Sequence, residues 1–244
     1  MPLKEKLKKV PGLVRLVRLC RIVISPSYRS QWLLQLRKPD NLFQPCSLTV
    51  FDRYPRIFYS VKQMLSGVSD PRLLSFGCST GEEVFTLRHY FPRAEIVGID
   101  INPRSIAVCK KKCARLFDAR LRFELTSSTE AEASSHYDAV FCMAVLRHGA
   151  LGQNRPEVCD HLIRFEDFEK TVSDFCRVLK PGGYLVIRHS NFRFTDTRVA
   201  AEFEVVPSDE AWDVRNSSPL YGRDNRLLPD AEDRDFVFRK LEWN

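Results

Sequence analysis

A short glycine-bounded turn and a single acidic residue further along the chain have the residue types and the spacing of a ligand-binding site. Gly77 and Gly81 bound the turn Gly-Cys-Ser-Thr-Gly, Glu82 and Glu83 follow it directly, and Asp100 comes nineteen residues after Gly81. Small residues let a ligand approach the backbone, and a carboxylate at the tip of the next strand can accept hydrogen bonds from both hydroxyls of a ribose. This spacing predicts a site for a nucleoside.

The acids after the turn indicate which nucleoside it is. The free N–H groups at a helix N-terminus attract anions, so a dinucleotide would place its pyrophosphate there. Glu82 and Glu83 occupy that position and disfavour a phosphate. An adenosine with a positive ammonium or sulfonium group fits better, and we therefore expect S-adenosyl-L-methionine (SAM) as the cofactor.

Apolar runs on both sides of the turn predict alternating strands and helices. A strand over 73–76 precedes the turn, a helix starts at Glu82, and a strand over 96–99 ends at Asp100. Further strands are expected over 121–125, 138–143 and 184–187, with helices from Pro103 and from Phe165. Residues 149–164 are expected to form a loop.

Two strings carry a resemblance to a known family. Residues 76–83, Phe-Gly-Cys-Ser-Thr-Gly-Glu-Glu, followed by Gly-Ile-Asp-Ile at 98–101, resemble the cofactor-binding part of class I SAM-dependent methyltransferases. Residues 179–183, Leu-Lys-Pro-Gly-Gly, are similar to a frequent signature of that family, and the turn alone is also similar to that of chemotaxis-receptor carboxyl methyltransferases. The resemblance implies a Rossmann-like α/β fold with a seven-stranded, mostly parallel sheet and helices on both faces. Segments 203–206 and 236–241 would be its closing strands.

The resemblance also implies where the cofactor and the acceptor lie. The expected cofactor-binding residues are Phe76, Gly77, Cys78, Ser79, Gly81, Glu82, Asp100, Ile101, Ser127 and Met143. Ser127 stands where many members of the family have an acid for the adenine amino group. His148 and His189 follow the fourth and fifth strands and are the candidate catalytic bases, needed only if the acceptor must lose a proton early. Arg147 and Asn191 are the candidate positioning groups.

Three alternatives compete with methyl transfer. Residues 77–81 satisfy Gly-x-Ser-x-Gly, so Ser79 could be the nucleophile of an α/β-hydrolase, although no histidine follows His189 in the chain. A nicotinamide enzyme would need a third glycine after Gly81. A non-catalytic SAM-fold protein that binds a partner remains open, because class I folds have no universal catalytic residue.

The net charge of +7 lies mostly in the first 24 residues, where seven basic residues face Glu5 alone. The remainder is nearly neutral, which disfavours nucleic acid as a partner. Arg15, Arg18 and Arg21 form one stripe on an apolar helix and interrupt any run long enough for a signal peptide or membrane span. We expect a cytoplasmic protein whose residues 1–24 either pack on the core or rest peripherally on an anionic membrane.

The remaining composition sets the expected organisation. Prolines break residues 25–69 into short helices, with segment 51–59 as a lid, so we expect a basic helix and lid over 1–69 and a SAM-binding domain over 70–244. The eight cysteines have no Cys-x-x-Cys spacing, which favours reduced, packed thiols and no metal site. Lysines 110–112 are expected to be solvated. The methyl acceptor and the oligomeric state have no signal in the sequence.

Overall fold

The computed structural model describes residues 12–37, 39, 41–207, 218–234 and 236–242. Contacts divide the chain into two units, Met1–Pro39 and Asp40–Asn244. The lysines and the glutamate expected to lie in the basic segment before residue 12 are outside the described residues.

The first unit contains two helices, α2 (Leu13–Ile24) and α3 (Pro26–Arg37). In α2, the apolar side chains of Leu16, Leu19 and Val23 recur on one face and are 58%, 60% and 73% exposed. The amphipathic helix expected from the sequence is therefore present over these residues. Within the described part of the chain, no helix has the length and apolar character needed to cross a membrane.

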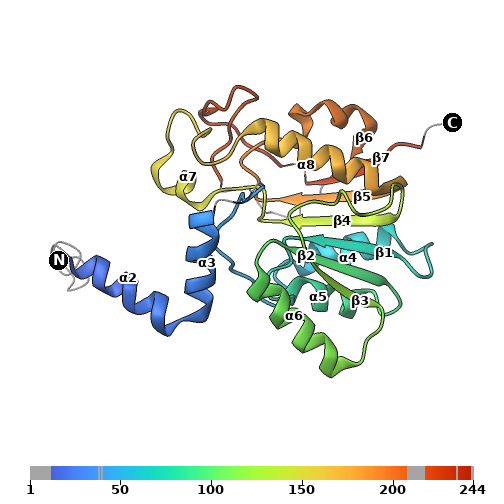
Figure 1. The fold of residues 1–244 in the computed structure, drawn as a ribbon. Helices are drawn as coiled ribbons and strands as arrows, with labels where there is room; N and C mark the ends of the chain where they lie inside the picture. Colours follow the sequence, from blue (N-terminus) through green and yellow to red (C-terminus); the bar gives the residue numbers. More distant parts are fainter. Residues whose placement is uncertain (1–11, 38, 40, 208–217, 235, 243–244) are drawn as a thin grey trace. The chain divides into compact units, whose positions relative to one another are not determined.

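The second unit is built on a seven-stranded sheet with the strand order β3-β2-β1-β4-β5-β7-β6 (Figure 1). The strands are β1 (Arg72–Phe76), β2 (Glu95–Asp100), β3 (Leu121–Leu125), β4 (Tyr137–Met143), β5 (Leu179–Arg188), β6 (Phe203–Val205) and β7 (Val237–Lys240). Strands β1 to β5 pair in parallel, and β7 pairs antiparallel with both β5 and β6. The strand order reverses beside β1, and ligands of such sheets bind beyond the carboxyl ends of the strands at that point.

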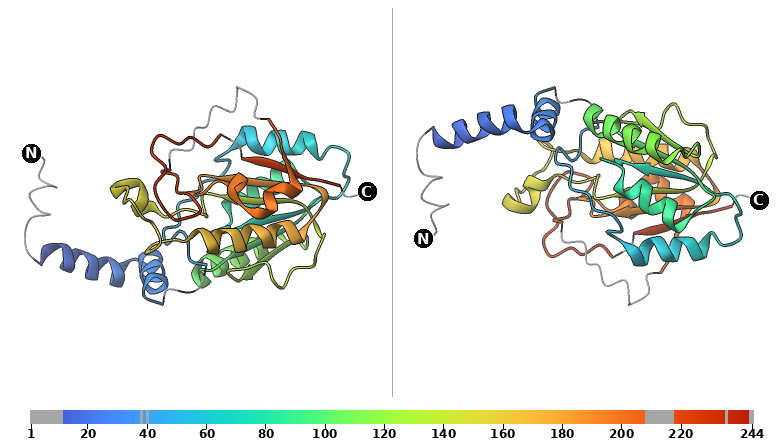
Figure 2. Two further views of the ribbon diagram at one scale, coloured as in Figure 1. Left: turned by 90° about the horizontal axis from the view of Figure 1, so that it is seen from above. Right: turned by 90° about the horizontal axis from the view of Figure 1, so that it is seen from below.

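Helices cover both faces of this sheet. The helices of this unit are α4 (Pro55–Met64), α5 (Glu82–Tyr90), α6 (Pro103–Leu116) and α8 (Phe165–Val178), with the 3-10 helices η1 (Phe194–Asp196) and η2 (Arg198–Glu202). A further short helix, α7 (Gly149–Asn154), lies beyond the ends of the strands (Figure 1). Figure 1 shows α8 on one face and α4, α5 and α6 on the other, and Figure 2 shows these three next to one another. The expected Rossmann-like α/β architecture is confirmed.

Alternation along the strands produces two apolar cores. Leu74 and Val140 face α8, where they pack in one cluster with Phe175. Their sequence neighbours Leu73 and Phe141 point to the opposite face and pack with the apolar sides of α4, α5 and α6. Burial of each such side chain contributes about 1.5–3 kcal/mol. The two cores hold the carboxyl ends of the central strands in fixed positions.

The segment 149–164 was expected to be a loop, and this prediction is wrong for its first residues. Residues 149–154 form helix α7. The side chain of His148 caps this helix, because its Nδ1 accepts a hydrogen bond from the N–H of Ala150 at 3.3 Å. The helix is short and has little apolar periodicity, so pattern analysis could not find it.

The Lys-Pro-Gly-Gly segment does not precede the fifth strand, as expected, but lies inside it. Leu179 already pairs with Tyr137, and the register then shifts so that Tyr184 pairs with Ala139. Residues 180–183 form the resulting bulge, and the positive φ of 77° at Gly182 is a backbone conformation that suits glycine.

The expected division at residue 69 differs from the boundary found at Pro39. Helix α4 lies in the core of the second unit, where Ile57, Phe58 and Val61 are at most 1% exposed. The contacts thus group α4 with the second unit, and the expected division at residue 69 stays a prediction.

Candidate active site

The glycine turn between β1 and α5 is shaped by three residues with positive φ. These are Gly77 at 73°, Ser79 at 51° and Gly81 at 92°. A Cβ atom on Gly77 would lie 2.4 Å from the side chain of Val145, and one on Gly81 would lie 2.9 Å from the ring of Phe85. The chain's own packing therefore requires glycine at both positions. The expected approach of a ligand to these glycines stays a prediction.

Glu82, the first residue of α5, is paired with a lysine. Its Oε1 lies 2.7 Å from Nζ of Lys112, and its Oε2 accepts a hydrogen bond from the Thr80 hydroxyl at 2.6 Å. Burial opposes ionisation of Glu82, but the hydrogen bonds from Lys112 and Thr80 outweigh it and lower the pKa of the carboxyl. The prediction that lysines 110–112 are solvated is wrong for Lys112, and the charge of Glu82 is largely neutralised.

Glu83 keeps a different environment. It is half-buried, and its Oε1 accepts a hydrogen bond from the Ser75 hydroxyl at 2.7 Å. Burial raises the pKa of Glu83 to about 7, although the Ser75 hydrogen bond and the positive field of Arg53 act in the opposite direction. The charge that we assigned to two glutamates therefore rests on Glu83, and it changes near neutral pH.

Asp100 lies at the end of β2 and is 8% exposed. Its Oδ2 accepts a hydrogen bond from the N–H of Ser79 at 2.8 Å, and its Oδ1 accepts one from the N–H of Asn102 at 2.7 Å. Burial raises the pKa of Asp100, and the two N–H donors oppose that shift. Since a carboxylate has about four acceptor positions, about two remain for ribose hydroxyls.

Ser79, whose N–H contacts this carboxylate, is buried. Its Oγ has no hydrogen-bond partner among the described residues. A hydrolase would need a histidine in contact with that Oγ as its base. The geometry does not support the α/β-hydrolase alternative, whereas a buried polar atom without a partner suits a polar ligand.

The other predicted cofactor residues take varied positions. Phe76 packs in the core with its ring centroid 4.8 Å from that of Phe175. Cys78 and Met143 are 2% and 8% exposed. Ile101 and Ser127 are half-buried at the ends of β2 and β3. These residues lie along one edge of the sheet, as expected, but the ring of Phe76 serves the core.

Asn191 joins the segments after β4 and β5. Its Oδ1 accepts a hydrogen bond from the N–H of His148 at 2.8 Å, and its Nδ2 donates to the carbonyl of Pro219 at 2.7 Å. The side chain is 1% exposed, so it holds loops together and is not placed to contact an acceptor.

His148 and His189 differ in what their rings can do. Nδ1 of His148 is already the acceptor that caps α7, and burial followed by the field of His161 lowers the pKa of His148. His189 directly follows β5, and its half-buried ring lies 5.9 Å, between centroids, from that of Tyr54. Of the two predicted bases, His189 is the one whose position suits proton transfer.

Two residues beside His189 had no individual role assigned from the sequence. The hydroxyl of Tyr54 is buried without a hydrogen-bond partner among the described residues. Arg188, the last residue of β5, is 2% exposed, and its Cζ lies 5.0 Å from the centroid of the Phe236 ring. Tyr54 lies in the expected lid and Arg188 directly follows the expected fifth strand, but no local sequence pattern showed that their side chains would be buried.

Backbone strain is found beyond the ends of the three central strands. Ser79, Ala144 and His189 follow β1, β4 and β5, and their φ values are 51°, 61° and 55°. Such conformations cost about 1–3 kcal/mol each and cluster at functional sites. This edge of the sheet is the candidate active site.

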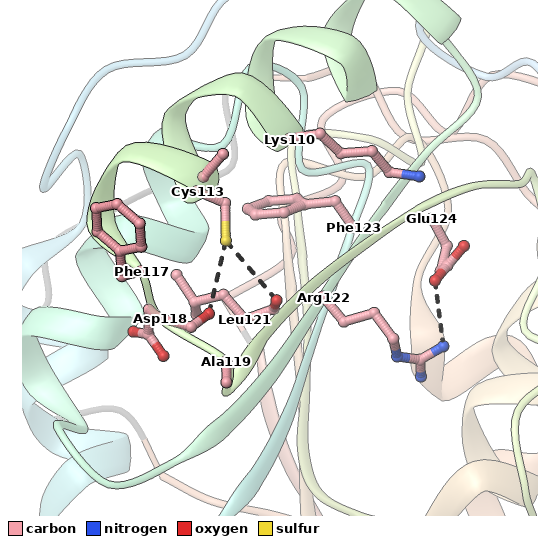
Figure 3. A pocket seen from close by; sticks show the side chains of 10 residues that line it. Lys110, Cys113, Phe117, Asp118, Ala119, Leu121, Arg122, Phe123 and Glu124 are labelled. Carbon is pink, nitrogen blue, oxygen red and sulfur yellow. Dashed lines mark hydrogen bonds and ion pairs between the residues drawn. The ribbon is translucent and has the colours of Figure 1, made fainter.

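A separate hollow of about 510 Å³ lies between α6 and β3. Figure 3 shows it lined by Cys113 and Phe117 on one side and Phe123 on the other. It contains none of the predicted site residues, so it is distinct from the candidate active site.

Comparison with known proteins adds a family match. A model described as a methyltransferase domain matches residues 68–224. A solved structure of a proposed rRNA methylase from Clostridium thermocellum is similar with a TM-score of 0.51 at 14% identity, covering 81% of this chain and all of that one. At that identity the likeness shows the fold alone.

Two curated relatives match part of the chain. An uncharacterized protein of Synechococcus sp. is 29% identical over 136 residues, which are 55% of this chain and 29% of the relative. A demethylmenaquinone methyltransferase of Thermus thermophilus is 29% identical over 117 residues, which are 48% of this chain and 46% of the relative. The chain thus matches less than half the length of these relatives.

Proposed function

Because the chain belongs to the methyltransferase domain family, we propose that it binds SAM and transfers the methyl group to an acceptor by in-line displacement at the sulfonium. The resemblance to class I SAM-dependent methyltransferases is confirmed at the level of family and fold. The activity of the whole protein is our proposal, since its relatives match only in part.

The observation behind the proposal is that the carboxylate of Asp100 accepts the N–H of Ser79 at the switch point of the sheet, while the buried Ser79 hydroxyl has no hydrogen-bond partner among the described residues. When bound, SAM supplies an electrophilic methyl group. Asp100 would hold the ribose hydroxyls, and Ser79 would add a hydrogen bond to the nucleoside. Glu83 would face the positive part of the cofactor, because it is the acid at the start of α5 that has no cationic partner within hydrogen-bond distance among the described residues.

The other residues of the site act on the acceptor. Tyr54 covers the carboxyl end of β5 and would exclude water, which favours attack by the acceptor over side reactions. Most of the acceleration would come from holding acceptor and methyl group in attack geometry. We assign His189 as the group that takes up a proton when the acceptor must lose one, because Nδ1 of His148 already caps α7.

Calorimetry with SAM and S-adenosylhomocysteine tests cofactor binding. Asp100→Asn should weaken binding by about 1.5–3 kcal/mol, the worth of a hydrogen bond to a charged group. Asp160→Asn removes the same charge from an exposed position and should leave affinity unchanged. No binding by the native protein at millimolar ligand would reject the proposal.

A non-catalytic SAM-fold protein, the alternative, would also bind SAM but would form no methylated product. Radiolabelled SAM incubated with fractionated lysate would separate the two, since an enzyme labels protein, lipid, RNA or a small molecule. Label transfer that stops with His189→Gln, while cofactor affinity is kept, would support catalysis and the role of His189.

We also propose that α2 associates peripherally with an anionic membrane surface from the cytoplasmic side. The support is the exposed apolar face of Leu16, Leu19 and Val23 next to the exposed Arg15 and Arg21. An amphipathic helix with basic residues on its polar face binds anionic lipid in two ways: its apolar face is buried in the lipid interface, and its basic residues attract the headgroups.

A further inference from the structure

The guanidinium of Arg188 is buried but incompletely paired. The side chain is 2% exposed, and neither Nε nor Nη2 donates a hydrogen bond to a described residue. The ring of Phe236 lies 5.0 Å from Cζ. An aromatic ring attracts the cation but does not accept these two N–H groups in the plane of the guanidinium. Burial lowers the pKa of Arg188, while the fields of Tyr54 and Asp233 oppose that shift.

The same protein shows what this edge of an arginine binds. Arg164 uses Nε and Nη2 together to hold the two carboxylate oxygens of Asp167, both at 2.9 Å. Arg88 holds Asp118 through the same two atoms, at 2.7 and 3.3 Å. Paired N–H donors of this kind match a planar oxyanion such as a carboxylate. At Arg188 the corresponding donors make no hydrogen bond to a carboxylate of the described residues, although the field of Asp233 reaches this guanidinium.

Tyr54, which the field of Arg188 reaches, and Arg147, which also acts on Tyr54, supply two further donors. The hydroxyl of Tyr54 and Nε of Arg147 are also buried without a hydrogen-bond partner among the described residues. The fields of Arg188 and Arg147 both reach Tyr54. Burial is the first cause that raises the pKa of Tyr54, so the phenol remains protonated and can donate. The unsatisfied atoms are therefore donors, and a ligand for them must supply acceptors.

The local charges favour an anion as well. Arg53, Arg147 and Arg188 act on Tyr54 with positive fields, and the opposing negative field is that of Glu83. Glu83 is hydrogen-bonded to Ser75 and has a pKa raised to about 7, so it offsets only part of this charge. A buried cation whose N–H groups lack acceptors is energetically unfavourable, and a bound anion that accepts from them would recover part of that cost.

We propose that the methyl acceptor carries an oxyanion, a carboxylate or a phosphate, which Arg188 grips through Nε and Nη2 with help from Arg147 and Tyr54. This inference rests on the proposed methyl transfer and names the class of its acceptor. The position fits, because Arg188 pairs in register with Met143 at the carboxyl ends of β5 and β4.

The experiment titrates the full-length protein, saturated with S-adenosylhomocysteine, with benzoate and with its neutral isostere benzamide. Benzoate should bind at least about tenfold more tightly, the effect of a charge-assisted hydrogen-bond pair. Phenyl phosphate in a third arm distinguishes a phosphate from a carboxylate as the preferred group. Equal binding of benzoate, phenyl phosphate and benzamide would overturn the proposal.

The variants separate this role from folding and from cofactor binding. Arg188→Lys keeps the charge but loses the paired donors, and Arg147→Gln leaves Arg188 in place; each should reduce the preference for the anion at least about threefold. Arg115→Gln removes one exposed charge on α6 and is the matched control. If S-adenosylhomocysteine affinity falls in the arginine variants, the arginines hold the carboxylate of the cofactor and the inference is wrong.

Failure of the proposed function gives a different result. If S-adenosylhomocysteine does not bind at all, methyl transfer is rejected, and titration of the protein alone with benzoate and benzamide still shows whether the arginines select an oxyanion. If S-adenosylhomocysteine binds and the anion preference is absent, only the acceptor class is rejected.

Discussion

Glu82 and Glu83 are adjacent in the sequence but differ in their electrostatic surroundings. Glu82 pairs with Lys112 across two helices, whereas Glu83 has the Ser75 hydroxyl as its hydrogen-bond partner. The raised pKa of Glu83, about 7, means that its negative charge appears only as the pH passes through neutrality. The preference of the site for a cationic nucleoside should therefore depend on pH.

The affinity for SAM should increase as the pH is raised from about 6 to about 8, because Glu83 loses its proton over this range while the cofactor remains cationic. Glu83→Gln should weaken binding at the higher pH and abolish the pH dependence. Glu82→Gln is the matched control, since its charge is already paired. Calorimetry at several pH values measures this, and an unchanged profile in Glu83→Gln would contradict it.

Stability should change in the opposite direction. The folded protein holds the proton of Glu83 more tightly than the unfolded chain, whose carboxyl has its ordinary pKa of 4.5. The contribution of Glu83 to the free energy of unfolding is therefore greatest below pH 4.5 and is lost as the pH rises through about 7. We expect Glu83→Gln to remove a decline of about 3 kcal/mol over that window. Urea denaturation at pH values below and above this window measures the free energy of unfolding. If that free energy depends on pH in the same way in the native protein and the variant, the prediction is wrong.

At the scale of elements, those that follow from a local sequence pattern could be predicted, and those that depend on tertiary contacts could not. The apolar runs predicted the first four strands to within one residue at each end, because each run is local and its burial leaves a periodic pattern. The fifth strand begins at Leu179, not at Tyr184 as expected, and the two closing strands were expected from the family resemblance. Helix α7 and the bulge at residues 180–183 were missed, since one depends on a side-chain cap and the other on pairing with β4. The pairing of Lys112 with Glu82 and the burial of Arg188 are likewise tertiary, and no local signal reveals them.

Helix α2 should bind vesicles of anionic lipid. Leu16, Leu19 and Val23 would enter the lipid interface, and the arginines would attract the headgroups, so binding should weaken as salt is added. Replacing Leu16 and Leu19 by serine should reduce co-sedimentation without changing the net charge. Equal sedimentation of this variant and the native protein, or no preference for anionic over neutral vesicles, would count against the role of α2.

At the scale of the whole molecule, the boundary at Pro39 makes a prediction about which part of the chain folds alone. A chain beginning at Asp40 should retain its melting temperature and its affinity for S-adenosylhomocysteine. A chain beginning at residue 70 would lose Ile57, Phe58 and Val61 from the core. Each such loss costs about 2–5 kcal/mol, so the shorter chain should not fold. Circular dichroism on heating compares them, and cooperative melting of the shorter chain would refute the boundary.

Cys109 lies beneath the glycine turn with no exposed surface, and its thiol donates to the carbonyl of Ser79 at 3.1 Å. A hydrogen bond with Cys109, followed by burial, raises the pKa of the neighbouring Cys78. Both sulfurs are buried, so an alkylating reagent cannot reach either of them until the turn opens. The rate at which these two cysteines are modified therefore measures how often the turn opens. A slower rate in the presence of a nucleoside would show that the nucleoside occupies the site, without any assay of product.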